Sequence, residues 1–103
     1  AEIAQSLILC AHTHVARAFR LSDGRMIVNP GSVGSPGYRD IHPFPHVIEA
    51  ATPDARYAIL ENVGGNWRVT FRHVPYDHGA MAELARRNGH AELANALATG
   101  WIK

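Results

Sequence analysis

In the stretch SLILCAHTH, residues 6–14, a short apolar run ends in two histidines, His12 and His14. An apolar run of this length, here residues 6–10, is typical of a buried strand. On an extended backbone, side chains two residues apart point to the same face, so both imidazoles would project from the end of that strand. Neutral imidazole is a common ligand of transition metals, and the pair therefore indicates a metal site.

The same pair has a simpler explanation. The chain holds 7 His among its 103 residues, so two histidines can fall at this spacing by chance. A closed metal site needs about four ligands, and no further Cys or His lies close by at ligand spacing. Taken alone, His12 and His14 leave both explanations open.

A second motif follows the histidines. Asp23-Gly24 is typical of a two-residue hairpin turn, because Gly accepts the positive φ that such turns need, and we therefore expect a β-hairpin over residues 19–28. The motif Asn-Pro-Gly-Ser, residues 29–32, comes directly after it. His-x-His, a hairpin and Asn-Pro-Gly-Ser, in this order, resemble the C-terminal part of a calcineurin-like metallophosphoesterase of the small bacterial single-domain phosphodiesterase branch. The resemblance continues through residues 57–60 and 74–77 and covers nearly the whole chain.

The resemblance implies a fold. Residues 1–103 would be the C-terminal part of a single metallophosphoesterase domain, a four-layer α/β/β/α sandwich, and the N-terminal half of the same domain would be their partner. In such enzymes that half supplies further metal ligands from Asp-x-His, Gly-Asp and Gly-Asn-His motifs. We expect these motifs upstream of the chain, which begins with Ala1 rather than Met and so looks cut.

The resemblance also implies a reaction, the hydrolysis of phosphomono- or phosphodiesters at a dinuclear site that holds two divalent metal ions, Mn, Fe, Ni or Zn. By motif, His12 would bind the second ion and His14 the first, beside the ligands of the N-terminal half. Without those ligands the chain alone is expected to be inactive. Ala11 stands where the family has Gly, which would strain the strand end if that position has a positive φ.

Asn29 and Ser32 are candidate substrate-binding or rim residues. The motif at 29–32 fits a type II turn, with Pro at its second position and Gly at its third. Asn29 is expected to brace the histidine loop rather than to touch metal. The loop over residues 32–34 either forms a plain turn or cradles an anion with its backbone N–H groups.

Residues 35–55 lack a hydrophobic period and are rich in proline, which predicts a long irregular loop. Within it, the strip HPFPH at residues 42–46 is stiffened by its two prolines. This strip either packs Phe44 against the body of the protein or forms a rim over the phosphoester site. In the second case His42 and His46 are rim residues.

The rest of the chain predicts a second hairpin and two helices. Residues 56–61 and 66–74 alternate as half-buried strands do, with these side chains inward: Tyr57, Ile59, Trp67, Val69 and Phe71. The opposite face carries Arg68, Thr70 and Arg72, which indicates a solvated face or, alternatively, a nucleic-acid stripe. Asp77 is expected to cap a helix over residues 78–88, and Gly100 to end a second over residues 91–99, after which Trp101 and Ile102 fold back. This order predicts an α+β fold with helices over one face of a largely antiparallel sheet.

Composition narrows the function classes. A net charge of +1 gives no general argument for nucleic acid as a partner. Cys10 is the single cysteine, so no internal disulfide is possible, and its place in the apolar run predicts a buried, inert thiol. No apolar stretch approaches the ~20 residues that span a bilayer, and no signal peptide is visible, so we expect a cytoplasmic hydrolase without a membrane partner. Homo-oligomerisation stays open, and the alternative function is a non-enzymatic β-rich binding or interaction module.

Overall fold

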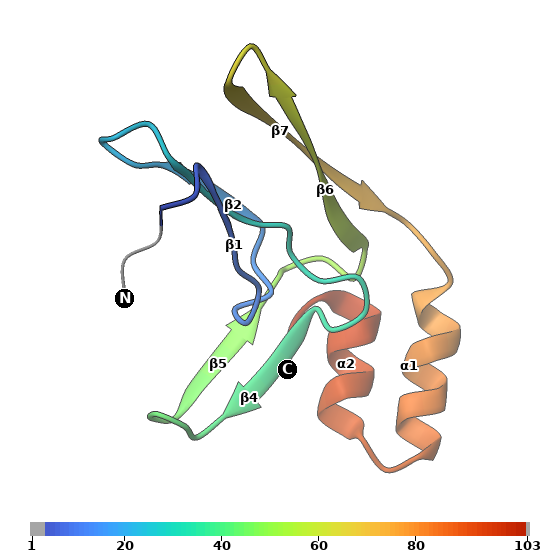
Figure 1. Ribbon diagram of the computed structural model, residues 1–103. Helices are drawn as coiled ribbons and strands as arrows, with labels where there is room; N and C mark the ends of the chain where they lie inside the picture. Colours follow the sequence, from blue (N-terminus) through green and yellow to red (C-terminus); the bar gives the residue numbers. More distant parts are fainter. Residues whose placement is uncertain (1–3, 103) are drawn as a thin grey trace.

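The first three strands form one small mixed sheet. A computed structural model of the chain describes residues 4–102, and in it β3 (Met26–Asn29) is the central strand. It pairs in parallel with β1 (Leu7–Leu9) and antiparallel with β2 (Arg17–Arg20) (Figure 1). Because only β3 has a neighbour on both edges, burial concentrates there, and Val28 is fully buried. The strand expected within residues 6–10 is present as β1, but the expectation that it is buried was wrong.

Two residues at the end of this stretch are exposed instead of buried. Leu9 is 61% exposed, and Cys10 is an exposed free thiol rather than a buried inert one. β1 is an edge strand of three residues that pairs on one side only, with β3. An apolar sequence predicts burial only when some other surface packs on it.

The predicted hairpin between β2 and β3 is confirmed, with a different turn. The N–H of Leu21 donates to the carbonyl of Arg25, so the loop holds three residues rather than two. The N–H of Gly24 closes the turn onto the carbonyl of Leu21, and Gly24 has the positive φ (90°) that the sequence predicted. This is a type I turn followed by a residue in the left-handed region, the next most common hairpin connection.

Residues 35–55 contain a third pair of strands, so the predicted irregular loop was wrong. β4 (Gly37–Asp40) and β5 (His46–Glu49) pair antiparallel, with Asp40 opposite His46 next to the loop. Each strand has four residues, which is too short for a hydrophobic period to show in the sequence. Tertiary packing contributes instead: a Cβ on Gly37 would lie 3.3 Å from the Cβ of Ala96, so glycine at this position allows a close approach of the second helix, which carries Ala96.

The second predicted hairpin is confirmed as β6 (Ala55–Val63) and β7 (Asn66–Val74), joined by Gly64 and Gly65, both with positive φ. The predicted grouping of its side chains was wrong by one residue. The register places Trp67, Val69 and Phe71 opposite Asn62, Leu60 and Ala58, whereas Tyr57 and Ile59 pair with Arg72 and Thr70 on the other face. Arg68, Thr70 and Arg72 are exposed, as expected for a solvated face.

The two predicted helices are confirmed within one residue. In α1 (His78–Arg87), the Asp77 side chain accepts a hydrogen bond from the N–H of Ala80, as an N-cap residue does. α2 (Ala91–Thr99) ends at Gly100, which has φ 85°. The helices pack on each other through small side chains and one leucine, namely Ala82, Ala85, Ala94 and Leu97.

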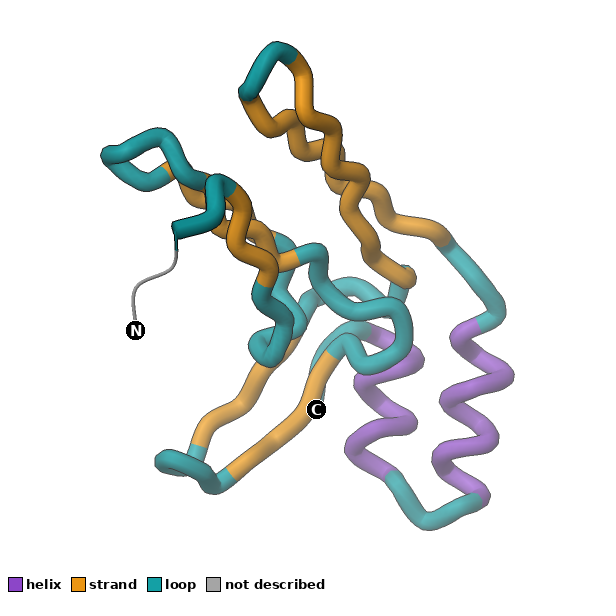
Figure 2. The backbone as a smooth tube through the Cα atoms, viewed as in Figure 1, coloured by secondary structure: helices purple, strands orange, loops and turns teal. Residues whose placement is uncertain are grey.

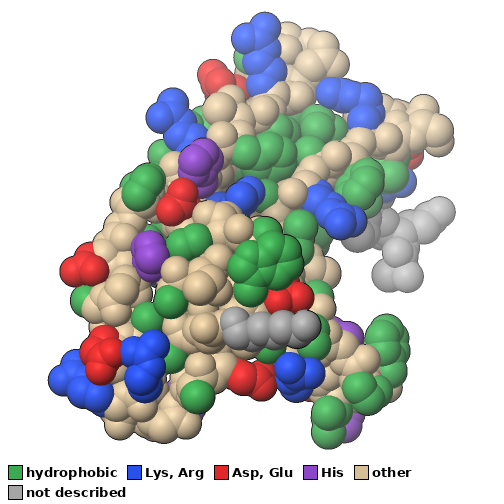
Figure 3. Space-filling model, turned by 180° about the vertical axis from the view of Figure 1, so that it is seen from behind, with side chains coloured by type: hydrophobic (Ala, Val, Ile, Leu, Met, Phe, Trp, Pro, Cys, Tyr) green, Lys and Arg blue, Asp and Glu red, His purple; other side chains and the backbone are tan. Residues whose placement is uncertain are grey.

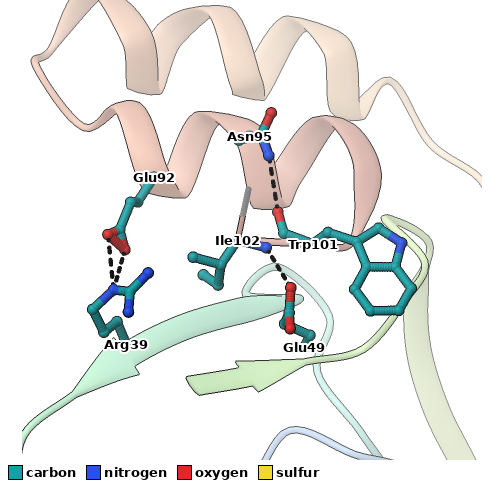
Figure 4. A network of polar contacts seen from close by, with 6 residues as sticks. All are labelled: Arg39, Glu49, Glu92, Asn95, Trp101 and Ile102. Carbon is teal, nitrogen blue, oxygen red and sulfur yellow. Dashed lines mark hydrogen bonds and ion pairs between the residues drawn. The ribbon is translucent and has the colours of Figure 1, made fainter. Parts of the chain in front are cut away.

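The end of the chain ties α2 to the β4–β5 hairpin. Ile102 is buried, and its N–H donates to a Glu49 carboxylate oxygen at 2.9 Å (Figure 4). Arg39 on β4 pairs with Glu92 on α2 at 3.1 Å. Trp101 is 48% exposed, so the expectation that the C-terminus folds back holds for Ile102 only.

The arrangement is α+β, with three separate small sheets instead of the single sheet predicted (Figure 2). The radius of gyration is 16.0 Å, whereas a compact domain of this length has about 13 Å. Several large apolar side chains are accordingly exposed, among them Phe19, Val33 and Ile41. In the described part of the chain, no helix is long and apolar enough to cross a membrane.

Candidate metal centre

His12 and His14 lie in a tight turn directly after β1. The N–H of His14 donates to the carbonyl of Ala11 at 3.2 Å, and the two histidines have φ of 21° and 60°. The backbone is therefore not extended there, and the two rings are presented by a turn rather than by a strand end. Ala11 is not among the described residues with positive φ, so the conformational cost falls on the histidines, a residue type that is enriched in this region.

The side chain of Asn29 holds this turn through hydrogen bonds. It is 6% exposed, at the end of the buried strand β3. Its Nδ2 donates to the carbonyl of Ala11 at 2.5 Å and to Oγ1 of Thr13 at 3.0 Å, and its Oδ1 accepts from the N–H of Gly31 at 3.0 Å. These contacts are the bracing that the sequence predicted for Asn29, and they link the histidine turn to the 29–32 motif.

The ring of His14 has a defined orientation. Its Nδ1 lies 2.7 Å from the carbonyl oxygen of Ser35. A carbonyl oxygen can only accept, so in the neutral ring Nδ1 carries the proton and Nε2 has the lone pair. A backbone carbonyl on the far nitrogen is the usual way in which proteins orient a metal-binding histidine.

Tyr38 on β4 joins the two histidines. Its hydroxyl donates to the carbonyl of His12 at 2.8 Å. Its ring centroid lies 4.8 Å from that of His14 and 6.2 Å from that of His12. Both imidazoles therefore lie around one aromatic ring. Sequence reasoning missed Tyr38 and Ser35, because both lie in the segment predicted to be an irregular loop.

Of the candidate rim histidines, His46 lies at the site and His42 lies in its surroundings. His46 joins it, with its ring 6.1 Å from that of Tyr38 and its Nδ1 2.8 Å from the carbonyl of Phe44. Phe44 does not pack against the body, since it is 64% exposed. The exposed His42 is held through its main chain, whose N–H donates to Asp40, and not through its ring.

Ser32 makes a local turn instead of an anion cradle. Its Oγ accepts from the N–H groups of Gly34 and Ser35 at 3.3 and 2.8 Å. Of the N–H groups of residues 32–34 that would form the cradle, that of Gly34 therefore already has a partner. The plain-turn alternative is therefore the one that the hydrogen bonds support.

Asp40 carries a carboxylate next to the histidines. Hydrogen bonds from the N–H groups of His42 and Ile41 hold its pKa below the ordinary value of 3.8, and the nearby His46 and His12 rings act in the same direction. Asp40-Ile41-His42 has the spacing of an Asp-x-His motif, although no group of three or more His, Cys, Asp or Glu within residues 4–102 is placed to hold a metal ion. Imidazole nitrogen is a donor type that divalent transition metals accept, so His12 and His14 would supply two ligands of a larger site.

Comparison with known proteins adds no relative. No protein-family model matches the sequence, and no curated protein matches it significantly. The contacts around His12, His14 and Tyr38 are therefore the basis for assigning a function.

Proposed function

We propose that residues 1–103 are the C-terminal part of a metal-dependent phosphoesterase of the calcineurin-like type, which hydrolyses phosphomono- or phosphodiesters. The observation that carries the proposal is the orientation of His14. Its Nδ1 donates to the carbonyl of Ser35, so its basic Nε2 is left for a metal ion.

The residues of the turn have distinct tasks in this proposal. His14 supplies Nε2 to one ion and His12 supplies a ring nitrogen to the other, while Asn29 and Tyr38 fix the main chain that carries them. Two divalent ions, Mn, Fe, Ni or Zn, would polarise the phosphoryl oxygens and lower the pKa of a bound water. In this proposal Ser32 serves the turn, because its Oγ already accepts from the N–H groups of Gly34 and Ser35, and His42 is a rim residue whose ring is exposed.

The open shape supports a partner for this chain. An apolar cleft of about 400 Å³ lies between the first sheet and the β6–β7 hairpin, with Leu9, Val28 and Leu60 among its lining residues. Such a surface is typical of one that another layer covers. In the proposal this layer is the N-terminal half of a four-layer sandwich in a cytoplasmic enzyme, and that half supplies the oxygen ligands.

The experiment is a two-component assay. The chain, the N-terminal half and their mixture are incubated with Mn²⁺ and the diester bis(p-nitrophenyl) phosphate, and nitrophenol release is followed. We expect hydrolysis only when both halves are mixed. In the mixture, the His12→Ala variant should abolish hydrolysis and the His73→Ala variant should retain it. His73 is the matched control, because it is an exposed histidine that pairs with Asp54 on the β6–β7 side of the molecule.

Two results would contradict the proposal. One is full activity of the His12→Ala mixture, which would remove the histidine from the reaction. The other is a mixture that forms a stable complex without any metal-dependent hydrolysis. That second result would favour the interaction module, for which the exposed apolar side chains of the open arrangement are the supporting observation.

A further inference from the structure

A row of rings runs from the loop of the β4–β5 hairpin to the histidine turn. The Phe44 centroid lies 5.7 Å from that of His46, His46 lies 6.1 Å from Tyr38, and Tyr38 lies 4.8 Å from His14. The Phe44–His46 and His46–Tyr38 pairs have the edge-to-face geometry that aromatic pairs favour, at 60° and 80°, and the Tyr38–His14 pair is tilted at 60°. In Figure 3 hydrophobic side chains and histidines gather at the lower right, over this hairpin.

Part of the row is open to solvent. Phe44 is 64% exposed. Tyr38 and His46 are half-buried, and each is fixed by one hydrogen bond: the Tyr38 hydroxyl donates to the carbonyl of His12, and His46 Nδ1 donates to the carbonyl of Phe44. The rings are therefore held in place before any ligand arrives.

The row lies where the organic part of a phosphoester would lie. An ester oxygen links the phosphorus directly to the organic group, so the two parts of the substrate occupy adjoining sites. With the phosphoryl group held at His12 and His14, the nearest aromatic wall is Tyr38, at 6.2 and 4.8 Å from their rings. A planar group stacked there would continue toward His46 and Phe44.

Charge at this wall favours an uncharged ligand. The Asp40 carboxylate lies at the end of β4, opposite His46. Its pKa is lowered by the N–H groups of His42 and Ile41, so it is ionised at neutral pH. A second phosphate on the organic side of the substrate would meet this negative charge, whereas a neutral ring would not.

We infer that Tyr38, His46 and Phe44 bind the planar organic group of the ester, so that aryl and heteroaryl phosphoesters are preferred to alkyl phosphoesters of equal charge. This inference rests on the proposed function for the phosphoryl end of the substrate only. Stacking on one aromatic side chain strengthens binding by about 5- to 150-fold. Because Phe44 is solvent-exposed, we expect the lower end, about fivefold, from its ring.

The experiment measures affinity rather than turnover. The full chain is titrated with phenyl phosphate and, separately, with ethyl phosphate, and dissociation constants are taken from NMR shifts of the hairpin signals, once with Zn²⁺ and once with EDTA. We expect phenyl phosphate to bind at least about fivefold more tightly in both conditions. Phe44→Ala should reduce that ratio toward one, and Phe71→Ala should leave it unchanged. Phe71 is the matched control, since it is also an exposed phenylalanine but lies on the separate β6–β7 hairpin.

Different outcomes of this experiment would contradict the ring site and the metal site. Equal affinity for the phenyl and ethyl esters, or a phenyl preference that Phe44→Ala leaves intact, would overturn the ring inference whatever the metal does. A phenyl preference that depends on Phe44 and is the same with Zn²⁺ and with EDTA would support the ring site. Affinity for both esters that does not change with Zn²⁺ would count against the metal site alone.

Discussion

Replacing Asn29 by Ala should destabilise the chain more than its single side chain suggests. Three hydrogen bonds disappear, and the N–H of Gly31 loses its partner, whereas the carbonyl of Ala11 keeps only the hydrogen bond from the N–H of His14. A buried polar group left without a partner costs about 1–3 kcal/mol. Because Ala11 is exposed, water replaces part of its bond, and we expect a loss of about 2–4 kcal/mol in the free energy of unfolding. The histidine turn, which Asn29 braces, should loosen at the same time.

The assay is equilibrium urea denaturation of the chain, with NMR signals of the His12 and His14 rings as a local report. Asn62→Ala is the matched control, because the exposed Asn62 also accepts a backbone N–H, from Gly65 at 3.1 Å. Its loss should cost about 0.5–1.5 kcal/mol. If Asn29→Ala destabilises no more than Asn62→Ala and leaves both ring signals in place, the bracing argument is wrong.

Three further predictions concern other parts of the fold. Tyr38→Phe removes the hydroxyl that donates to His12, so the His12 ring signals should shift in NMR while the free energy of unfolding falls by only about 0.5–1.5 kcal/mol; unchanged signals would contradict the contact. The pKa of Asp40 is lowered in the folded chain, so its carboxylate stabilises the β4–β5 hairpin at pH values above the ordinary pKa of 3.8. This stabilisation is lost as the pH falls below 3.8 and through the lowered pKa. Hairpin amide signals should follow that loss and should not do so in Asp40→Asn. Gly100→Ala should lower the melting temperature far more than Gly24→Ala, because both glycines have positive φ but only the first would place a Cβ 2.1 Å from the N of Thr52; equal shifts would show that the clash relaxes.

Local chemistry made part of the fold predictable. The Asp23-Gly24 and Gly64-Gly65 turns need positive φ, and glycine is the residue that accepts it, so both hairpins were visible in the sequence. Asp77 at one helix start and Gly100 at a helix end have equally local causes. Each of these features depends on residues within a few positions of one another.

Long-range contacts account for what the sequence hid. β4 and β5 are too short to show a period, and their placement depends on α2, whose Ala96 lies against Gly37. The exposure of Leu9 and Cys10 depends on what covers β1, which no local pattern records. An apolar run and a proline-rich run were therefore assigned to the wrong environments.

Only part of the candidate site could be predicted from the sequence. The motifs pointed to His12, His14 and Asn29, and the hydrogen bonds of Asn29 match the role expected of it. Tyr38 and Ser35 reach the site through chain reversals of more than 20 residues. Such contacts follow from the path of the backbone, so no spacing rule in the sequence identifies them.

The most direct test of the metal site is a Zn²⁺ titration of the chain, followed through the imidazole nitrogens by NMR. We predict that His14 in the metal-free chain carries its proton on Nδ1, as the hydrogen bond to Ser35 requires. Added Zn²⁺ should then shift the ring signals of His12 and His14 together, with the change at His14 falling on Nε2. A proton on Nε2 of His14 in the metal-free chain, or a titration in which Zn²⁺ shifts other histidines and leaves these two unchanged, would contradict the account.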